Sequence, residues 1–341
     1  MVNLVEAQKP LLHFLVRRAG LRQHTVDVDG AGTVITFWVP KDKVPSDKPT
    51  VRDATTPDTK LPPPPPAAAA KKDRPAVVLV HGFAAEGIVT WQFQVGVLAK
   101  HYDVYVPDLL YFGGSTSPSA DRSPGFQAEC LATALRKLGV GPCAVVGFSY
   151  GGMVSFKMAE AHPDLVRWLV VSGSVVAMTD SISEEALERI GVKSSAELLL
   201  PESVRGLKAL LSIATYRKLW FPDRLHRDYL EVMFTNRKER AELLEGLVVS
   251  NKDATVPVLP QVPVRPPLPL TPALLAADRR AGNAIVGIGV VPARCREPFR
   301  PGCWSKHFGL FFFVPFKIPK FYKILHHIES FNESFNACMK Y

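Results

Sequence analysis

The stretch Gly147-Phe148-Ser149-Tyr150-Gly151 decides the fold of this chain. It follows the apolar run 143–146 and opens a helix-like run at 152–159. A strand that turns abruptly into a helix holds its central serine in a strained backbone conformation, and glycines two positions to either side avoid the resulting clashes. This context favours a nucleophile elbow, with Ser149 as nucleophile, over an ordinary Gly/Ser-rich turn.

A second motif, His81-Gly82-Phe83, follows the apolar run 76–80. In a fold with a nucleophile elbow, the loop after this strand supplies one backbone donor of the oxyanion hole, and the residue after the nucleophile supplies the other. We therefore expect the N–H groups of Phe83 and Tyr150 to hold the oxyanion, with Gly82 allowing close approach of the substrate. His81 is expected to brace the loop rather than to transfer protons.

These motifs, together with segment 106–115 (Val-Pro-Asp-Leu-Leu-Tyr-Phe-Gly-Gly-Ser), resemble plant α/β hydrolases of the monoacylglycerol-lipase-like or esterase type. The resemblance covers about 1–261. It implies a serine hydrolase that acts on carboxylic esters, with a small ester or lipid-like substrate. Epoxide hydrolases and haloalkane dehalogenases share this fold but have an aspartate at the elbow, so Ser149 argues against both chemistries.

The pattern along the chain predicts an α/β fold, the α/β-hydrolase fold, with a mostly parallel sheet and helices on both faces. A hairpin at 22–40 is expected at the sheet edge. The expected core spans 1–174, interrupted by an exposed Pro/Ala-rich loop at 41–75. Apolar strand candidates alternate with helical stretches: strands at 76–80, 102–107, 143–148 and 166–172, and helices near 91–100, 124–138 and 150–162.

Residues 175–250 read as helices alone and predict a helical cap inserted after a core strand. Such a cap covers the nucleophile, excludes water and shapes the acyl pocket. Leu210, Met233 and Phe234 could line that pocket, but packing within the cap is the favoured interpretation of apolar residues at helical spacing.

The chain departs from the resembled family after Gln261. A serine hydrolase of this fold has its catalytic residues in the order Ser, acid, His. In the resembled family, a Trp-Gly-Glu-x-Asp turn carries the catalytic acid and a Gly-His turn carries the catalytic histidine. Both turns are missing here. We expect the return to the core to begin at 251 and to break off near 261. A poorly ordered basic tail without strand–helix alternation should follow, of unrelated sequence such as a retained intron or a gene-model artefact. Residues 262–341 carry 11 Lys and Arg against 4 Asp and Glu, net +7 of the chain's +9.

Substitutes for the missing acid and base are few. Asp180 is expected to cap a helix, Asp108 to end a strand and His162 to end a helix. A catalytically incomplete hydrolase, or a binding protein that retains the capped pocket, therefore stays open as the alternative function. The remaining candidates for a base or acid are His307, His326, His327, Glu297, Glu329, Asp223 and Asp253.

Composition excludes several other classes of function. The five cysteines show no paired spacing, so neither disulfides nor a metal site is predicted, and no cofactor motif occurs. The scattered basic residues give no nucleic-acid motif. The apolar run 309–316 is too short to span a bilayer. Residues 11–15, followed by Arg17 and Arg18, predict a short amphipathic helix that docks on the domain or touches a membrane surface. We expect a cytoplasmic protein, and peripheral contact with membranes stays an open alternative. The sequence predicts no oligomeric state.

Overall fold

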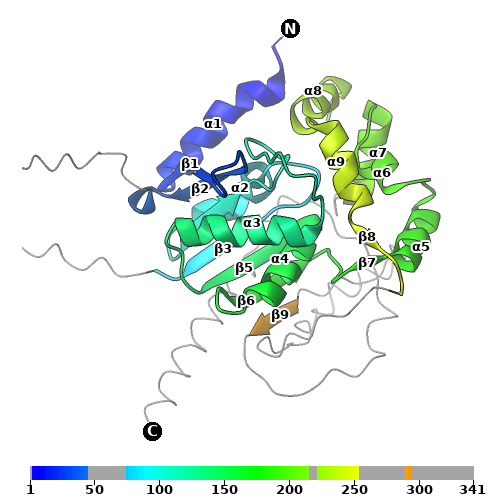
Figure 1. The fold of residues 1–341 in the computed structure, drawn as a ribbon. Coiled ribbons are helices and arrows are strands. Elements are labelled where there is room, and N and C mark those ends of the chain that lie inside the picture. The colour runs from blue at the N-terminus through cyan, green and yellow to red at the C-terminus, as the bar shows by residue number, and fades with distance from the viewer. Residues whose placement is uncertain (1, 45–73, 215–220, 253–288, 293–341) are drawn as a thin grey trace, which may run out of the picture.

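The fold is a seven-stranded sheet, seen in a computed structural model that describes residues 2–44, 74–214, 221–252 and 289–292 (Figure 1). The strand order is β1-β2-β4-β3-β5-β6-β9. The strands are β1 Leu21–Asp27, β2 Val34–Pro40, β3 Ala76–Val80, β4 Asp103–Pro107, β5 Cys143–Phe148, β6 Val166–Ser172 and β9 Gly289–Pro292.

The central strands β3, β4, β5 and β6 pair in parallel, as predicted. They are short runs of mostly valine and other apolar residues, which suits strands buried on both faces. The predicted hairpin is also confirmed: β1 pairs antiparallel with β2, which continues antiparallel onto β4. Val78 and Val80 face one layer of the core, and Val77 and Leu79 face the other, following the two-residue period of a strand.

Helices cover both faces of the sheet. The first face contacts α3 (Pro124–Lys137) and α4 (Tyr150–Ala161), whose buried Leu131 and Met158 belong to the larger core cluster. The second face contacts α1 (Leu4–Arg18) and α2 (Gly87–Leu98). A short 3-10 turn, η1 (Lys41–Lys43), follows β2.

The segment expected to form a cap contains five helices, which lie together on one side of the sheet in Figure 1. Two-residue strands, β7 (Met178–Thr179) and β8 (Val248–Val249), pair in parallel where this segment begins and ends. The pattern of the sequence did not predict them. The helices are α5 Asp180–Ile190, α6 Ser195–Leu199, α7 Val204–Ala214, α8 Asp223–Met233 and α9 Arg237–Glu245.

Asp180 does not cap α5, contrary to expectation. The hydroxyl of Thr179 accepts the N–H of Ile182 and caps the helix, which begins at Asp180 itself. The carboxylate of Asp180 instead accepts the N–H of Asn251, at 3.3 Å. Because Asn251 follows β8, this bond joins the entrance of the helical segment to its exit.

The tail contributes one short edge strand, β9, although the pattern of the sequence shows no alternation of strands and helices there. Strand β9 pairs antiparallel with β6, with Leu169 opposite Val291. Without β9, the N–H and C=O groups along this edge of β6 would have no strand to pair with. Pro292 has no N–H to donate, and it lies at the end of β9, where a sheet tolerates proline. The rest of the tail, and the Pro/Ala-rich loop from 45 to 73, lie outside the described residues.

Candidate active site

Ser149 lies between β5 and α4 with φ 52° and ψ −123°, a conformation that non-glycine residues rarely adopt. Its N–H donates to the carbonyl of Ser172 at 2.9 Å, and its carbonyl accepts the N–H of Gly152 at 2.8 Å. These two bonds fix the strained backbone on both sides of the side chain. The side chain of Ser149 is half-buried. Strain of this kind, held in place by its surroundings, is typical of functional sites.

Gly147 and Gly151 leave no room for a side chain. A Cβ built on Gly147 would lie 2.5 Å from the hydroxyl of Ser155. One built on Gly151 would lie 2.7 Å from the carbonyl oxygen of Val80, at the end of β3. The two glycines therefore let α4 start directly against β3 and β5, and this close packing gives the sharp turn its geometry.

The loop that follows β3 lies directly beside Ser149, as the sequence predicts. A Cβ on Gly82 would lie 3.1 Å from the Cβ of Ser149 and 3.0 Å from the ring of Phe148. The buried rings of Phe83 and Tyr150 meet edge to face, with their centroids 5.7 Å apart. Neither the N–H of Phe83 nor that of Tyr150 has a hydrogen-bond partner within the described part of the chain. Two residues with unused donors thus flank the serine.

His81 braces this loop, as expected. Its Nδ1 donates to the carbonyl of Gly82 at 2.6 Å, and its Nε2 accepts the N–H of Leu109 at 2.9 Å. Both ring nitrogens are therefore occupied, with the proton on Nδ1. Complete burial lowers the pKa of His81 to about 4, because the cation would be desolvated. A neutral imidazole with both nitrogens bonded is poorly suited to accept a proton from Ser149.

Asp108 supports the same loop from the end of β4. Its Oδ1 accepts the N–H of Gly87 at 2.7 Å, at the start of α2, and its carbonyl accepts the hydroxyl of Ser115 at 2.7 Å. Burial raises the pKa of Asp108 to about 7, because the carboxylate is removed from water. Asp108 is thus a structural residue at a strand end, as predicted.

A buried cation connects the helical segment to this loop, and no pattern in the sequence indicated it. Arg240 of α9 is 1% exposed, and its guanidinium lies 4.1 Å from the centroid of the Phe112 ring. The Nε of Arg240 donates to the carbonyl of Tyr111 at 3.0 Å, and Nη1 donates to that of Met233 at 2.5 Å. Phe112 in turn packs against His81 and Phe83, at 4.9 and 5.3 Å. Burial lowers the pKa of Arg240 to about 10, and it stays charged.

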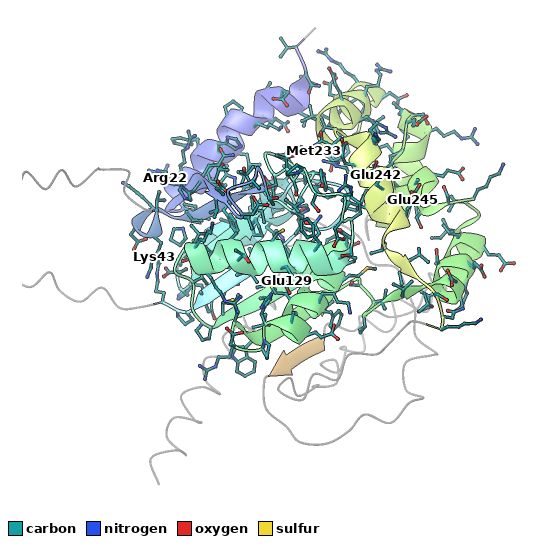
Figure 2. The ribbon with its side chains drawn as sticks, in the orientation of Figure 1. Arg22, Lys43, Glu129, Met233, Glu242 and Glu245 are labelled. Atoms are coloured by element: carbon teal, nitrogen blue, oxygen red, sulfur yellow. The ribbon has the colours of Figure 1, made fainter. Side chains whose placement is uncertain are left out.

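A second link joins the helical segment to the loop through Tyr229 of α8, whose hydroxyl donates to the carbonyl of Ala84 at 3.2 Å. Burial raises the pKa of the Tyr229 phenol well above its usual range. Leu210, Met233 and Phe234 are all buried within the main core cluster, which agrees with the packing interpretation. Figure 2 shows Met233 where α8 meets the core.

No hydrogen bond joins the Ser149 hydroxyl to a histidine or carboxylate in residues 74–214 or 221–252. His162 ends α4, as predicted, and lies 3.1 Å from Glu129. Asp223 pairs with Lys208 at 2.5 Å. The other acid and base candidates of the sequence, Asp253, Glu297, His307, His326, His327 and Glu329, lie outside the described residues.

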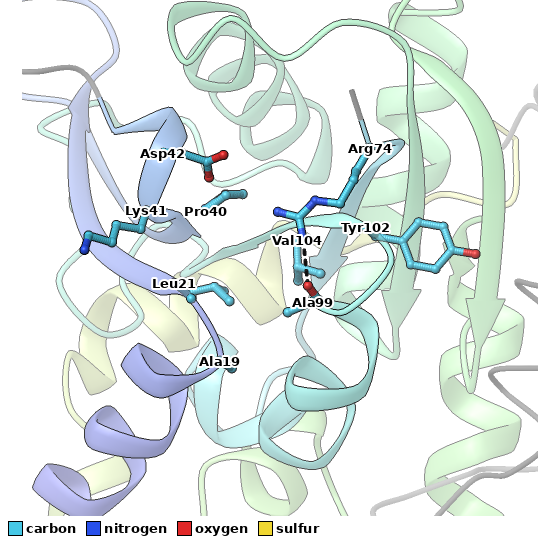
Figure 3. Close-up of a pocket in the computed structure, with 10 residues that line it drawn as sticks. Ala19, Leu21, Pro40, Lys41, Asp42, Arg74, Ala99, Tyr102 and Val104 are labelled. Carbon is cyan, nitrogen blue, oxygen red and sulfur yellow. Dashed lines mark hydrogen bonds between the residues drawn. The ribbon is translucent and has the colours of Figure 1, made fainter. Parts of the chain in front are cut away.

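Two clefts are lined by described residues at other parts of the surface, and Ser149 lines neither of these two. One, of about 420 Å³, lies where β3 and β4 begin, at the opposite end of the parallel strands from the elbow (Figure 3). Arg74 reaches into it, but donates to the carbonyl of Ala99 at 2.9 Å and pairs with Asp103 at 2.8 Å, so its charge is neutralised. The other, of about 240 Å³, is lined by Lys9, His13, Glu86 and Asp108 among others.

Within the described residues, no group of three or more potential ligands could hold a metal ion.

Residues 75–199 match the family described as the alpha/beta hydrolase fold. The chain has the α/β-hydrolase fold. Among solved structures, this chain is similar to a bacterial membrane phospholipase A, with 25% identity and a TM-score of 0.53 over 72% of this chain and 67% of the other. It is also similar to a putative lipase from Acinetobacter baumannii, with 19% identity and a TM-score of 0.53 over 72% and 71% of the two chains.

Curated relatives match a smaller part of this chain. An uncharacterized protein of Mycobacterium bovis is 33% identical over 129 residues, 37% of this chain and 38% of its own length. Epoxide hydrolase 3 of Xenopus tropicalis is 33% identical over 102 residues, 29% and 28% of the two chains. The chain thus spans less than two fifths of these relatives. No helix of the described residues is long and apolar enough to cross a membrane.

Proposed function

We propose that this chain is a serine hydrolase of carboxylic esters, with Ser149 as the nucleophile. The observation that carries the proposal is the position of Ser149: a strained serine at the start of α4, with the Gly82–Phe83 loop against its Cβ. The N–H groups of Phe83 and Tyr150 are the proposed oxyanion donors, because both lie beside the serine and neither is used elsewhere in the described residues. Gly82, Gly147 and Gly151 permit this packing.

The proposed reaction is acyl transfer in two steps. The Ser149 oxygen attacks the ester carbonyl while its proton passes to a base, and the carbonyl oxygen becomes an oxyanion held by the two N–H groups. Collapse of this intermediate expels the alcohol, which takes up that proton, and leaves an acyl-serine. Water then attacks the acyl-serine, releasing the acid and restoring the hydroxyl. The base is not identified; His307, His326 and His327 are the histidines late enough in the chain to follow the order Ser, acid, His.

The residue at the elbow favours esters over epoxides. The chain is similar to proteins named epoxide hydrolases, but in the resemblance described above those enzymes carry an aspartate at the elbow. A serine hydroxyl suits attack on an acyl carbon, since the oxyanion that forms there is what two backbone donors can stabilise. The proposed substrate is a small ester or lipid-like ester, because residues 1–261 are near neutral: the whole chain is +9 and the tail accounts for +7, which leaves +2.

One observation favours a second candidate, a catalytically incomplete hydrolase that keeps its pocket for binding. Ser149 has no histidine partner in the described residues, and the nearby His81 uses both nitrogens in bracing the loop. A serine without its base loses several orders of magnitude in rate.

Hydrolysis of p-nitrophenyl butyrate by the purified full chain separates the two candidates. We expect turnover that falls by about a thousandfold in Ser149→Ala. Ser194→Ala is the matched control, because Ser194 also precedes a helix, α6, but with an ordinary extended backbone (φ −153°, ψ 158°). A folded wild-type chain that is no faster than Ser149→Ala would establish the incomplete hydrolase. Alanine variants of His307, His326 and His327 then identify the base.

A further inference from the structure

Helix α1 has two apolar faces, and only one of them packs against the domain. Val5 and Val16 are 9% and 3% exposed and belong to the two core clusters. About a third of a turn away, a second row of apolar side chains faces outward. We name this row the outer stripe; its members Leu4, Leu11, Phe14 and Leu15 are 39%, 60%, 56% and 53% exposed.

The outer stripe follows helical spacing rather than being a scatter of exposed residues. Leu4, Leu11 and Leu15 are seven and four residues apart, which places them on one line along the helix. Phe14 lies one helical position to the side of this line. Single exposed apolar residues are normal on a protein surface, but four leucine and phenylalanine side chains along one face, interrupted by Gln8, indicate a surface that something covers.

Helix α1 is fixed in place, so it does not turn to bury the stripe. The side chain of Asn3 donates to Glu231 of α8 at 3.0 Å, and the N–H of Leu4 donates to the carboxylate of Asp228 at 2.8 Å. In the middle of the helix, Lys9 pairs with Glu86 at 3.3 Å. Figure 1 shows α1 on the outside of the molecule, running from the β1–β2 hairpin towards α8.

Positive charges gather where α1 ends. Arg17 and Arg18 form its exposed last turn, and Arg22 donates to the carbonyl of Arg17 at 3.1 Å. The N–H of Lys41 donates to the carbonyl of Gly20 at 2.8 Å, which brings a fourth cation to this basic end, with Asp42 beside it. Figure 2 places Arg22 at this end of α1. The carboxylate in the first turn, Glu6, is paired with Lys9 at 3.2 Å.

We propose that α1 docks on an anionic lipid surface, with the outer stripe inserted at the boundary between headgroups and acyl chains. Leucine and phenylalanine on one face, with arginine at its edge, form the pattern of a helix that lies in a membrane interface. The long side chain of Arg18 can lie along the stripe with its guanidinium at the headgroups. The basic end supplies the attraction to anionic lipid, and the net charge of +9 acts in the same direction.

Charge favours lipid over a second copy of this chain as the occupant. In an antiparallel pairing of two α1 helices, each basic end would face the first turn of the other helix, where the carboxylates are already engaged: Glu6 pairs with Lys9, and Asp228 and Glu231 accept hydrogen bonds from Leu4 and Asn3. In a parallel pairing, the two basic ends would repel each other. An anionic bilayer gives the cations of the basic end partners while it covers the stripe.

Vesicle flotation of the full chain tests the proposal. We expect the wild-type chain to float with vesicles of phosphatidylcholine and phosphatidylserine, and to bind pure phosphatidylcholine about tenfold more weakly. The triple variant Leu11→Gln/Phe14→Gln/Leu15→Gln should lose binding by about tenfold or more on the mixed vesicles. The variant Arg17→Glu/Arg18→Glu should bind weakly and lose the salt dependence that the wild type shows. Circular dichroism confirms that each variant is folded.

Two controls make the result specific. Phe93→Gln/Val97→Gln removes two exposed apolar side chains from α2, and Ser149→Ala removes the proposed nucleophile; both should bind as the wild type does. Wild-type chain that stays in solution would overturn the proposal. So would a triple variant that still floats, because binding would then come from another part of the chain. A concentration-dependent dimer in light scattering that the triple variant abolishes would assign the stripe to a second copy instead.

Discussion

Gly82 lies so close to Ser149 that a Cβ added to the glycine would be 3.1 Å from the Cβ of the serine. Residues 67 positions apart in the chain therefore share one small volume at the carboxyl ends of β3 and β5. This contact brings a backbone loop against a strained hydroxyl, which is the arrangement that acyl transfer needs.

Gly82→Ala should reduce the labelling rate of Ser149 by a serine-reactive probe by about tenfold or more, since the methyl group would displace Phe148 or Ser149. We also expect the free energy of unfolding to fall by about 1–3 kcal/mol, measured by urea denaturation. Gly96→Ala is the matched control: Gly96 lies in α2 with nothing within 4 Å of the added Cβ, so this change should stabilise the protein by about 1 kcal/mol. Unchanged labelling in Gly82→Ala would remove the loop from the site.

Arg240→Met should lower the free energy of unfolding by about 2–4 kcal/mol. The change removes the donor of the Met233 carbonyl, leaves the Tyr111 carbonyl with only the Asn236 side chain as donor, and removes the cation from the Phe112 ring. Lys238→Met in the same helix is exposed and should change stability by less than about 0.5 kcal/mol. Equal effects of the two substitutions in urea denaturation would show that Arg240 does not tie α9 to the core.

His81 and Asp108 should give opposite pH dependences of stability. The pKa of His81 is lowered to about 4, so the unfolded chain binds more protons between about pH 4 and 6.5, and stability from His81 rises with pH in this window. The pKa of Asp108 is raised to about 7, so the folded chain binds more protons between about pH 4 and 7, and stability from Asp108 falls as pH rises. In the wild type these contributions oppose each other.

Removing one group should uncover the other. Asp108→Asn keeps an acceptor for the N–H of Gly87, and its stability should rise by about 3 kcal/mol between pH 4 and 6.5, more steeply than that of the wild type. Urea denaturation across this range measures the slope. A slope in Asp108→Asn identical to that of the wild type would mean that Asp108 titrates normally in the folded protein.

Tyr229→Phe should lower the free energy of unfolding by about 1 kcal/mol, because the hydrogen bond to the carbonyl of Ala84 is lost while the ring is kept. The same variant should label more slowly at Ser149 if α8 holds the loop in position. Tyr102→Phe, at the opposite end of β4 from this loop, is the control for the labelling of Ser149. A loss of stability without any change in labelling would separate the packing of α8 from the geometry of the site.

The sequence predicted the parallel strands and the elbow because their signals are local. Runs such as 76–80 and 143–148 are bounded by polar or turn residues, and the serine between two glycines has few other uses in that context. The start of α2 was predicted at 91 but lies at Gly87. Glu86 makes no capping bond through its side chain, and the first turn is held instead by Asp108, a contact across the fold that no local pattern reveals.

The contacts that join the helical segment to the site could not be predicted. Arg240 and Tyr229 lie in ordinary amphipathic helices, and nothing in their spacing shows that one stacks on Phe112 and the other reaches Ala84. Strand β9 was missed for a similar reason: its pairing partner, β6, lies more than a hundred residues earlier in the chain, and a four-residue run is too short to show a period.

The most direct measurement of the central claim is the site of fluorophosphonate attachment, read by peptide mass spectrometry of the intact labelled chain. The proposed function predicts one adduct, on Ser149, that disappears in Ser149→Ala and persists in Ser194→Ala. A folded chain that takes up no probe, or an adduct that persists on another residue in Ser149→Ala, would contradict it.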